Sequence, residues 1–486
     1  MPRALHTLEP SAVWRHFEQL CSIPRPSGHE AQVAAHILGL AHAWGLEAST
    51  DAIGNVFIKK PARRGMDGRR TVVLQAHLDM VPQQSATSTH NFVTDPIQPS
   101  FDGTLVRAMG TTLGADNGIG LATALAVLES RSLVHGPIEV LFTVDEEAGM
   151  TGARNLQPGF LTGDILLNLD SEDEGEICIG CAGGADAKAV FAYTEVAAPA
   201  DGVGYRVTVS GLKGGHSGVD IHLGRGNANK VLARLLYGQR DTGVLVSSFV
   251  GGTLRNAIAR DATATVYVPR DSAARFQRSL AAATAVVQAE LRVADPDLQV
   301  SVDVVTLPTH SMDAATTGRL LGALVACPHG IFAMVPGMGT VTETSTNLAI
   351  VVAGGGSVAV TNMLRSSVDS KKDDVAAMLR AVYELAGADV TISGSYPGWQ
   401  PAPDAPLLAR LQSIYAEMFH QPARVTATHG GLECGLIRAV YPHMEALSIG
   451  PTIRFPHSPD EQVDVASVQR FWGFLVEVLR HIPSHG

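Results

Sequence analysis

The sequence is poor in several features that mark particular classes of protein. Only five of its 486 residues are cysteines, and an odd, sparse set argues against a disulfide framework. No apolar run reaches the roughly 20 residues that a membrane-spanning helix needs, and the N-terminus lacks the apolar core of a signal peptide. We therefore expect a cytoplasmic protein without a membrane partner.

Positive charge is also scarce. The formal net charge is -11, and basic residues occur only in short pairs such as Arg63-Arg64 and Arg69-Arg70. Nucleic-acid binders usually carry a basic face or tail, so we expect no nucleic-acid partner. Cys178 and Cys181 form a CxxC motif, but no second pair completes a zinc knuckle and the flanking residues resemble a strand. A structural role is the favoured interpretation of this motif.

Glycine and apolar residues are plentiful. The chain has 49 glycines, 45% hydrophobic residues and 17% charged residues, a composition typical of folded proteins. The length predicts two or three domains. Apolar strands are predicted at 71–76, 138–144 and 165–169, and they alternate with helices. This pattern predicts an α/β domain whose sheet is mixed and largely parallel.

The middle of the chain has a different pattern. Strands with alternating apolar and polar residues are predicted at 205–210 and 262–268, beside helices at 227–237 and 272–291. This predicts an inserted α+β domain of ferredoxin-like type, and its duplication stays open because no strict repeat is visible. We assign residues 1–187 and 393–486 to one discontinuous domain and residues 188–392 to the insertion.

Five clusters of acids and histidines stand out at or near the ends of predicted strands, where α/β sheets hold ligands. Each is ambiguous alone. A lone loop histidine needs no function, an aspartate before a helix can simply cap it, and a run of three acids can be a solvated surface. The clusters are centred on His77 with Asp79, Asp116, Glu146 with Glu147, Asp170, and His457.

Taken together, these residue types suit a metal centre. Imidazole and carboxylate ligands favour zinc, manganese or cobalt. A bridging carboxylate would hold two ions roughly 3.5–4 Å apart, with one activated water between them. Neighbouring Glu146 and Glu147 offer two separate functions, because one can bind a metal while the other takes a proton from water.

The same segments resemble the M20 metallopeptidase family, and most closely its aminoacyl-histidine dipeptidase branch. The resemblance spans nearly the whole chain. The order of the five clusters is highly specific, although each cluster alone is weak. The matching runs are His77-Leu-Asp79-Met-Val-Pro, Gly114-Ala-Asp116-Asn-Gly-Ile-Gly, Asp145-Glu146-Glu147-Ala-Gly, Asn168-Leu-Asp170-Ser-Glu and Phe455-Pro-His457-Ser-Pro.

The resemblance implies a centre with two divalent metal ions, zinc first, with manganese or cobalt as alternatives. It also implies a role for each residue of the clusters. His77 and Asp170 would bind one ion, Glu147 and His457 the other, and Asp116 would bridge them, while Asp79 would orient His77 and Glu146 would be the general base.

The inserted domain resembles the lid and dimerisation domain of the family, so a homodimer and lid closure are expected. In the glycine-rich loop 212–218, His216 would stabilise the oxyanion. Asn256 would contact the substrate, and Arg365 would clamp its carboxylate, with a structural salt bridge as an equal alternative for Arg365. Glu433 would meet the free amino group of the substrate.

The resemblance therefore implies hydrolysis of Xaa-His dipeptides of the carnosine type and of other dipeptides. Two alternatives stay open. One is a related amidohydrolase, such as a tripeptidase or a deacylase. The other is a non-catalytic metal-binding relative, against which the presence of Asp79, Glu146 and His216 argues.

Overall fold

The computed structural model describes residues 5–485, so part of the N-terminus on which the signal-peptide expectation rests lies outside it. The chain forms two compact units. The first contains the residues up to 180, residues 401–427 and those from 432 onwards, and the second contains residues 181–400 and 428–431. Among the helices of residues 5–485, none has the length and apolar character needed to cross a membrane.

The boundaries of the units differ from those expected from the sequence. The expected boundary at 187/188 falls inside strand β9 (Gly183–Ala192), and the one at 392/393 falls inside β21 (Asp389–Tyr396). Both strands lie whole in the sheet of the second unit. The first three residues of β9, Gly183 to Ala185, are all buried. The alternation of buried and more exposed residues, by which the second unit was recognised in the sequence, therefore begins only after the strand has started.

The first unit is built on an eight-stranded sheet with the order β1-β2-β6-β3-β7-β23-β8-β22. β3 pairs in parallel with β6 and β7, and β23 pairs in parallel with β7, whereas β2 and β8 join this centre in antiparallel fashion. The expectation of a mixed sheet with parallel character is thus confirmed. The strands are β1 (Glu47–Thr50), β2 (Val56–Lys60), β3 (Val72–His77), β6 (Ile138–Thr143), β7 (Ile165–Asn168), β8 (Glu176–Cys181), β22 (Arg424–Thr428) and β23 (Glu445–Ser448).

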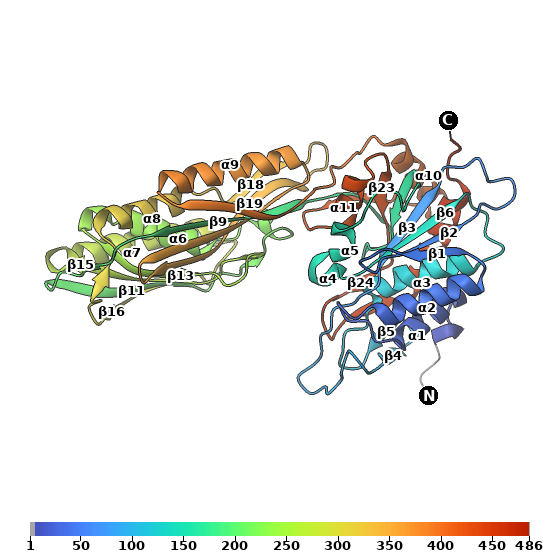
Figure 1. The fold of residues 1–486 in the computed structure, drawn as a ribbon. Coiled ribbons are helices and arrows are strands. Elements are labelled where there is room, and N and C mark those ends of the chain that lie inside the picture. The colour runs from blue at the N-terminus through green and yellow to red at the C-terminus, as the bar shows by residue number, and fades with distance from the viewer. Residues whose placement is uncertain (1–4, 486) are drawn as a thin grey trace. The chain divides into compact units, whose positions relative to one another are not determined.

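Apolar composition explains the central position of three of these strands. Every residue of β3, β6 and β7 is buried, as expected for parallel strands that are covered on both faces. Figure 1 shows the first three helices along one side of the sheet. The longer helices of this unit are α1 (Ser11–Cys21), α2 (Ala31–Ala43), α3 (Ala115–Glu129), α10 (Pro406–Phe419), α11 (Glu433–Val440) and α12 (Val465–Arg480).

A small four-stranded sheet in the first unit joins distant parts of the chain. Its order is β24-β25-β5-β4, and Val463 of β25 lies opposite Val106 of β5. The loop with His457 connects β24 to β25. The strands are β4 (Pro99–Phe101), β5 (Leu105–Ala108), β24 (Ile453–Arg454) and β25 (Gln462–Asp464).

The second unit contains a nine-stranded antiparallel sheet with the order β16-β11-β15-β13-β19-β20-β9-β21, and β18 also pairs with β19. Helices α6 to α9 lie along this sheet (Figure 1). Besides β9 and β21, the strands are β11 (Gly202–Ser210), β13 (Leu245–Gly251), β15 (Ala262–Pro269), β16 (Gln299–Val305), β18 (Gly330–Met334), β19 (Thr342–Gly354) and β20 (Ser357–Ser366). The helices are α6 (Ala228–Tyr237), α7 (Ala273–Leu291), α8 (Ala314–Ala326) and α9 (Asp369–Leu385).

The two halves of this sheet have the same connectivity. In one half, the elements follow one another along the chain as β11, α6, β13, β15, α7 and β16. Across the sheet, the four strands lie in the order β16, β11, β15, β13, so that the last strand is at the edge beside the first. In the other half, β9, α8, β19, β20, α9 and β21 give the same order, although the whole first half lies between β9 and α8 in the sequence. Each half thus has the βαββαβ order of ferredoxin-like folds, and the pairing of β13 with β19 joins them.

Candidate active site

Parallel pairing brings three of the predicted clusters to one edge of the first unit's sheet. His77 is the last residue of β3. Glu146 and Glu147 begin the short helix α4 (Glu146–Gly149), just after β6, and Asp170 follows β7. Because β3 pairs in parallel with both β6 and β7, the carboxyl ends of the three strands meet at the same edge.

Asp116 and His457 complete this group. His77 Nε2 lies 3.1 Å from Asp116 Oδ1 and 3.4 Å from Asp170 Oδ1. His457 Nε2 lies 3.3 Å from Asp116 Oδ2 and 3.0 Å from Glu147 Oε2. Asp116 therefore lies between the two histidines and directs one oxygen toward each. The sets His77/Asp116/Asp170, His77/Glu146/Glu147 and Asp116/Glu147/His457 each have ligand atoms within 4.8 Å of one another.

The chemistry of this donor set fits divalent cations. In residues 5–485, no lysine or arginine forms an ion pair with Asp116, Glu147 or Asp170, whose ion-pair partners are the two histidines. Glu147 also has one buried oxygen without a hydrogen-bond partner. Grouped carboxylates that are removed from water are costly unless positive charge compensates them, and imidazole with carboxylate suits zinc, manganese or cobalt.

The pKa values reflect the same concentration of negative charge. Hydrogen bonds to Asp116 and Glu147 raise the pKa of His457 to about 11. Burial raises the pKa of Asp170 to about 6, with a further increase from Asp116 and Glu147. Burial also raises the pKa of Glu146 well above its usual value. A bound cation would relieve this unfavourable burial of negative charge.

Asp79 connects the end of β3 to the acids after β6. Its Oδ1 lies 3.3 Å from His77 Nδ1, and its carboxylate accepts hydrogen bonds from the backbone N–H groups of Glu146 (3.0 Å) and Glu147 (3.1 Å). Burial would raise the pKa of Asp79, but the hydrogen bond and charge of His77 help to hold it at about 2. Asp79 is thus placed to orient His77 through the nitrogen that faces away from the cluster.

Ser27 and Glu30 have the spacing of a helix capping box, but they do not form one. The Ser27 hydroxyl donates to Asp79 Oδ2 at 2.7 Å, and Glu30 accepts from the N–H groups of Gly28 and Asp145. Helix α2 starts at Ala31 without a side-chain cap. Local spacing suggested a cap, but both side chains instead bind segments that follow β3 and β6.

The helix-cap interpretation of Asp116 is also wrong. Helix α3 is preceded by Gly114 and has no side-chain cap, while the Asp116 carboxylate contacts His77 and His457. A different acid, Glu461, accepts the backbone N–H groups at this helix start.

In the second unit, His216 is held as a neutral hydrogen-bond donor. Its Nδ1 faces the N–H groups of Gly218 (3.3 Å) and Val219 (3.1 Å). Because two donors point at Nδ1, this nitrogen is the acceptor and the proton resides on Nε2. Burial lowers the pKa of His216, and the nearby charge of Arg365 lowers it further.

Arg365 and Asn256 lie close to this histidine. Arg365, on β20, is only 5% exposed, and its Nη2 lies 3.4 Å from His216 Nε2. No carboxylate in the described part of the chain pairs with Arg365, and its buried Nε has no partner, so nothing favours the salt-bridge alternative. Asn256 is exposed on a neighbouring loop, and its backbone carbonyl accepts the Ser217 N–H at 2.8 Å.

Comparison with known proteins agrees with this site. Residues 73–481 match the family described as Peptidase family M20/M25/M40. The cytosol non-specific dipeptidase of Escherichia coli K12 is 45% identical over 481 residues, which cover 99% of each chain. The chain belongs to the M20 peptidase family. It is therefore a peptide hydrolase, and the resemblance noted in the sequence is confirmed.

Solved structures support the M20 assignment. A crystal structure of aminoacylhistidine dipeptidase from Vibrio alginolyticus is 46% identical, covers 100% of this chain and 99% of its own, and has a TM-score of 0.95. The aminopeptidase PepT of Bacillus cereus is 16% identical with a TM-score of 0.57 over 98% of this chain and 99% of its own. At that identity, the second likeness concerns the fold alone.

Glu433 of this M20 chain does not lie on an exposed loop. It is the first residue of α11 and only 1% exposed. Its Oε2 accepts hydrogen bonds from Gln75 Nε2 (2.6 Å) and Thr143 Oγ1 (2.7 Å), while Oε1 is buried without a partner. Burial raises the pKa of Glu433 to about 7. The carboxyl thus lies beside β3 and β6, near the strand ends that carry the acid cluster.

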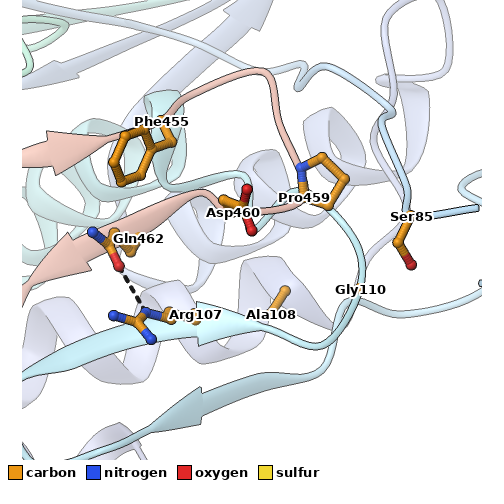
Figure 2. A pocket seen from close by; sticks show the side chains of 8 residues that line it. All are labelled: Ser85, Arg107, Ala108, Gly110, Phe455, Pro459, Asp460 and Gln462. Carbon is orange, nitrogen blue, oxygen red and sulfur yellow. Dashed lines mark hydrogen bonds between the residues drawn. The ribbon is translucent and has the colours of Figure 1, made fainter.

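An open pocket of about 550 Å³ borders the loop that carries His457. Figure 2 shows Phe455, Pro459 and Asp460 of this loop on one side of the pocket and Arg107 of β5 on the other, with Arg107 Nε donating to Gln462 Oε1 at 2.7 Å. None of the five candidate metal ligands lines it. The lining residues are Ser85, Arg107, Ala108, Gly110, Phe455, Pro459, Asp460 and Gln462.

The sequence interpretation missed the polar residues that support the ligands. Gln75 donates to Glu433 and accepts from the side chain of Asn168, whose own oxygen accepts the Asp170 N–H. A polar residue inside an otherwise apolar buried strand is the signal that would have identified Gln75 and Asn168, because such a group requires a partner.

Proposed function

We propose that this M20 peptidase is a dipeptidase that works with two divalent cations and accepts Xaa-His and other dipeptides. The observation that carries the proposal is the convergence of two histidines and several carboxylates at the carboxyl ends of β3, β6 and β7, without an ion pair to a lysine or arginine among residues 5–485. The substrate class follows from the relatives, which are named a cytosol non-specific dipeptidase and an aminoacylhistidine dipeptidase.

The five converging residues would divide between the two cations. His77 with Asp170 would hold one, Glu147 with His457 the other, and Asp116 would serve both, since its two oxygens face different histidines. When bound, the cations would polarise the scissile carbonyl and lower the pKa of water toward neutrality. We propose zinc as the metal, with manganese or cobalt as alternatives, because the donors are nitrogen and oxygen.

Glu146 would carry the proton. It lies in the donor set with His77 and Glu147, and Asp79 holds its backbone N–H. A carboxylate there would take a proton from the attacking water and pass it to the leaving amine. The burial that raises its pKa suits a group that must hold a proton between these two steps.

The second unit would supply donors to the substrate. His216 would donate from Nε2 to the oxyanion, and Arg365 would bind the substrate carboxylate through its guanidinium. Asn256, whose loop adjoins that of His216, would add a further polar contact. For Glu433, whose carboxyl is bound by Gln75 and Thr143, we propose support of the strand ends in place of direct contact with the substrate amine.

Two further proposals rest on the family and on the named relatives. We propose that the chain forms a homodimer, as the resemblance implies, and that it works in the cytoplasm, as the name of the E. coli relative suggests. Size measurement in solution would test the dimer, because a single chain of 51.1 kDa differs twofold in mass from its dimer.

A substrate panel tests the proposed function. The purified protein is assayed with Xaa-His dipeptides, other dipeptides, tripeptides and N-acyl amino acids, first with added zinc and then after removal of metal by a chelator. We expect hydrolysis of dipeptides, including Xaa-His, that is lost on chelation and restored by metal. Hydrolysis of tripeptides or N-acyl amino acids without any of dipeptides would instead identify a different amidohydrolase.

A further inference from the structure

Glu461 makes an unusual set of contacts for a residue without a proposed role. It is only 2% exposed, and its carboxylate accepts four consecutive backbone N–H groups. Oε2 accepts from Leu113 (2.7 Å) and Gly114 (2.9 Å), and Oε1 accepts from Ala115 (2.7 Å) and Asp116 (3.1 Å). Both carboxylate oxygens are thus used to hold the segment that presents Asp116.

The same residue ends the turn that presents His457. The Glu461 N–H donates to the Ser458 carbonyl at 3.0 Å, and His457 itself has a left-handed φ of 59°. Pairing of Ile453 with Val463 closes the base of this loop, and Figure 2 shows Phe455, Pro459, Asp460 and Gln462 of the loop. Glu461 therefore links two segments that are separated by more than 300 residues.

A buried arginine fixes the Asp116 segment from another side. Arg25 donates to the carbonyl of Gly114 at 2.5 Å and to those of Leu78 and Asp79 at 3.0 and 2.8 Å. A Cβ atom on Gly114 would lie 2.8 Å from Arg25 Nη2 and 2.8 Å from Met80 Sδ. Glu461 thus satisfies the N–H groups of this turn while Arg25 satisfies one of its carbonyls.

Asp170 has a separate support. Its carboxylate accepts from the side chain of Asn117, and its N–H donates to Asn168 Oδ1 at 3.3 Å. Neither Asn168 nor Asp170 contacts Glu461 in the described hydrogen bonds, whereas Glu461 holds the segments of both Asp116 and His457. Loss of Glu461 should therefore displace both Asp116 and His457 at the cation that Glu147 would bind, but only the shared Asp116 at the cation that His77 and Asp170 would bind.

We propose that Glu461 is a positioning residue that fixes the separation of Asp116 and His457, and that it acts chiefly on the cation that Glu147 and His457 would bind. This inference rests on the proposed function, since it presumes that the cluster binds metal. The physical reason is the fixed distance between ligands that a cation requires. Residues that orient metal ligands typically contribute roughly 10–100-fold to metal affinity.

The test is zinc binding by the E461Q variant. A glutamine keeps the size of the side chain, but its NH₂ group would face two N–H donors that now have an acceptor, which forces the segment to shift. Zinc is titrated into the metal-free protein in competition with a chromophoric chelator. We expect one of the two ions to bind roughly 10–100-fold more weakly and the other to change much less, so that zinc content falls toward one per chain at limiting zinc.

E139Q is the matched control. Glu139 is 4% exposed in the same unit, and its carboxylate also accepts several hydrogen bonds, from the Thr162 N–H and hydroxyl and the Gly163 N–H. It lies near the start of β6, away from the strand end that carries Glu146. E139Q should lower the temperature of unfolding of the metal-free protein as E461Q does, yet bind two zinc ions with unchanged affinity.

The outcomes separate this inference from the proposed function. Failure of the unaltered protein to bind two zinc ions would contradict the proposed function itself. If the unaltered protein binds two ions and E461Q binds both with unchanged affinity, or loses both equally, the positioning role is wrong.

Gly114→Ala provides a second route should E461Q fail to fold. It leaves Glu461 intact and displaces the same turn through Arg25 and Met80. We expect weaker binding of both zinc ions, because Asp116 would contact both, and two unchanged zinc affinities in a folded G114A protein would overturn the inference.

Discussion

The two histidines of the acidic cluster in the first unit and three histidines of the second unit lie in opposite electrostatic surroundings. In the first unit, His77 and His457 face carboxylates, and in both cases this contact raises the pKa. In the second unit, burial lowers the pKa of His216, His329 and His429, and a neighbouring cation lowers it further, Arg365 for His216 and His429 and Lys230 for His329. The surroundings of these histidines thus favour positive charge in the first unit and a neutral imidazole in the second.

This difference indicates what each unit requires from a ligand. The acids at the ends of β3, β6 and β7 exceed the positive charge around them and would be balanced by cations. Arg365 Nη2 lies 3.4 Å from His216 Nε2, and no carboxylate among residues 5–485 pairs with Arg365, so an anionic group would balance its charge. The substrate of a peptidase carries such groups, as its carboxylate and as the oxyanion that forms during hydrolysis.

The largest effect is expected in the acidic cluster of the first unit, from the substitution E146Q. Glutamine cannot take a proton from water, so kcat should fall roughly 10²–10⁴-fold, while the protein should still bind two zinc ions because the five ligands are unchanged. The steady-state rate and the zinc content of the same sample give both results.

D145N is the control for E146Q, because Asp145 belongs to the same acid run but its carboxylate accepts the Thr151 hydroxyl. It should keep activity within a few-fold. Equal rates for E146Q and D145N would exclude Glu146 as the base.

A smaller effect is expected from the hydrogen-bond donors of the second unit. H216A removes the Nε2–H donor and should lower kcat roughly 10²–10³-fold, with zinc affinity unchanged because this histidine is not a metal ligand. H216Q keeps an N–H donor and should recover part of the rate. The neighbouring exposed His222 provides the control H222Q, and a similar rate for H216A and H222Q would contradict the role of His216 in the reaction.

Much of the fold and the site could be predicted from local pattern. The apolar runs that became β3, β6 and β7 were recognisable, and parallel pairing explains why His77, Glu147 and Asp170 converge although they are far apart in sequence. In contrast, the contacts of Glu461 with the segment 113–116 join residues about 350 positions apart. Spacing within a local window contains no information about such a pair.

Two polar side chains have placements of similar physical origin. Ser27 has the spacing of a helix cap, whose oxygen would accept a backbone N–H, yet its hydroxyl instead donates to Asp79, because a charged carboxylate is a strong acceptor and water can satisfy the N–H groups at the helix start. Glu433, for which the resemblance implies contact with the substrate amine, is buried, and its carboxylate is bound by Gln75 and Thr143. In both cases, tertiary hydrogen bonding decided where a polar side chain lies.

The smallest predicted effect concerns the stability of the second unit at low pH. Burial and Lys230 lower the pKa of His329 to about 4, against about 6.5 in an unfolded chain. The unfolded state therefore binds the proton more readily, so the stabilising contribution is present above pH 6.5 and is lost as the pH falls toward 4. Between pH 7 and pH 5 this loss should reach roughly 1–2 kcal/mol for a partly buried group.

The variant H329Q isolates this contribution, because glutamine can still accept the Leu348 N–H that His329 Nδ1 accepts at 3.3 Å. The measurement is hydrogen exchange of β19 peptides in the metal-free protein at pH 7 and pH 5, corrected for the intrinsic exchange rate. The opening free energy should fall between these pH values by roughly 1–2 kcal/mol less in H329Q than in the unaltered protein. The exposed His310 gives the control H310Q, which should follow the unaltered protein, whereas an equal pH dependence in all three proteins would show that His329 titrates alike in the folded and unfolded states.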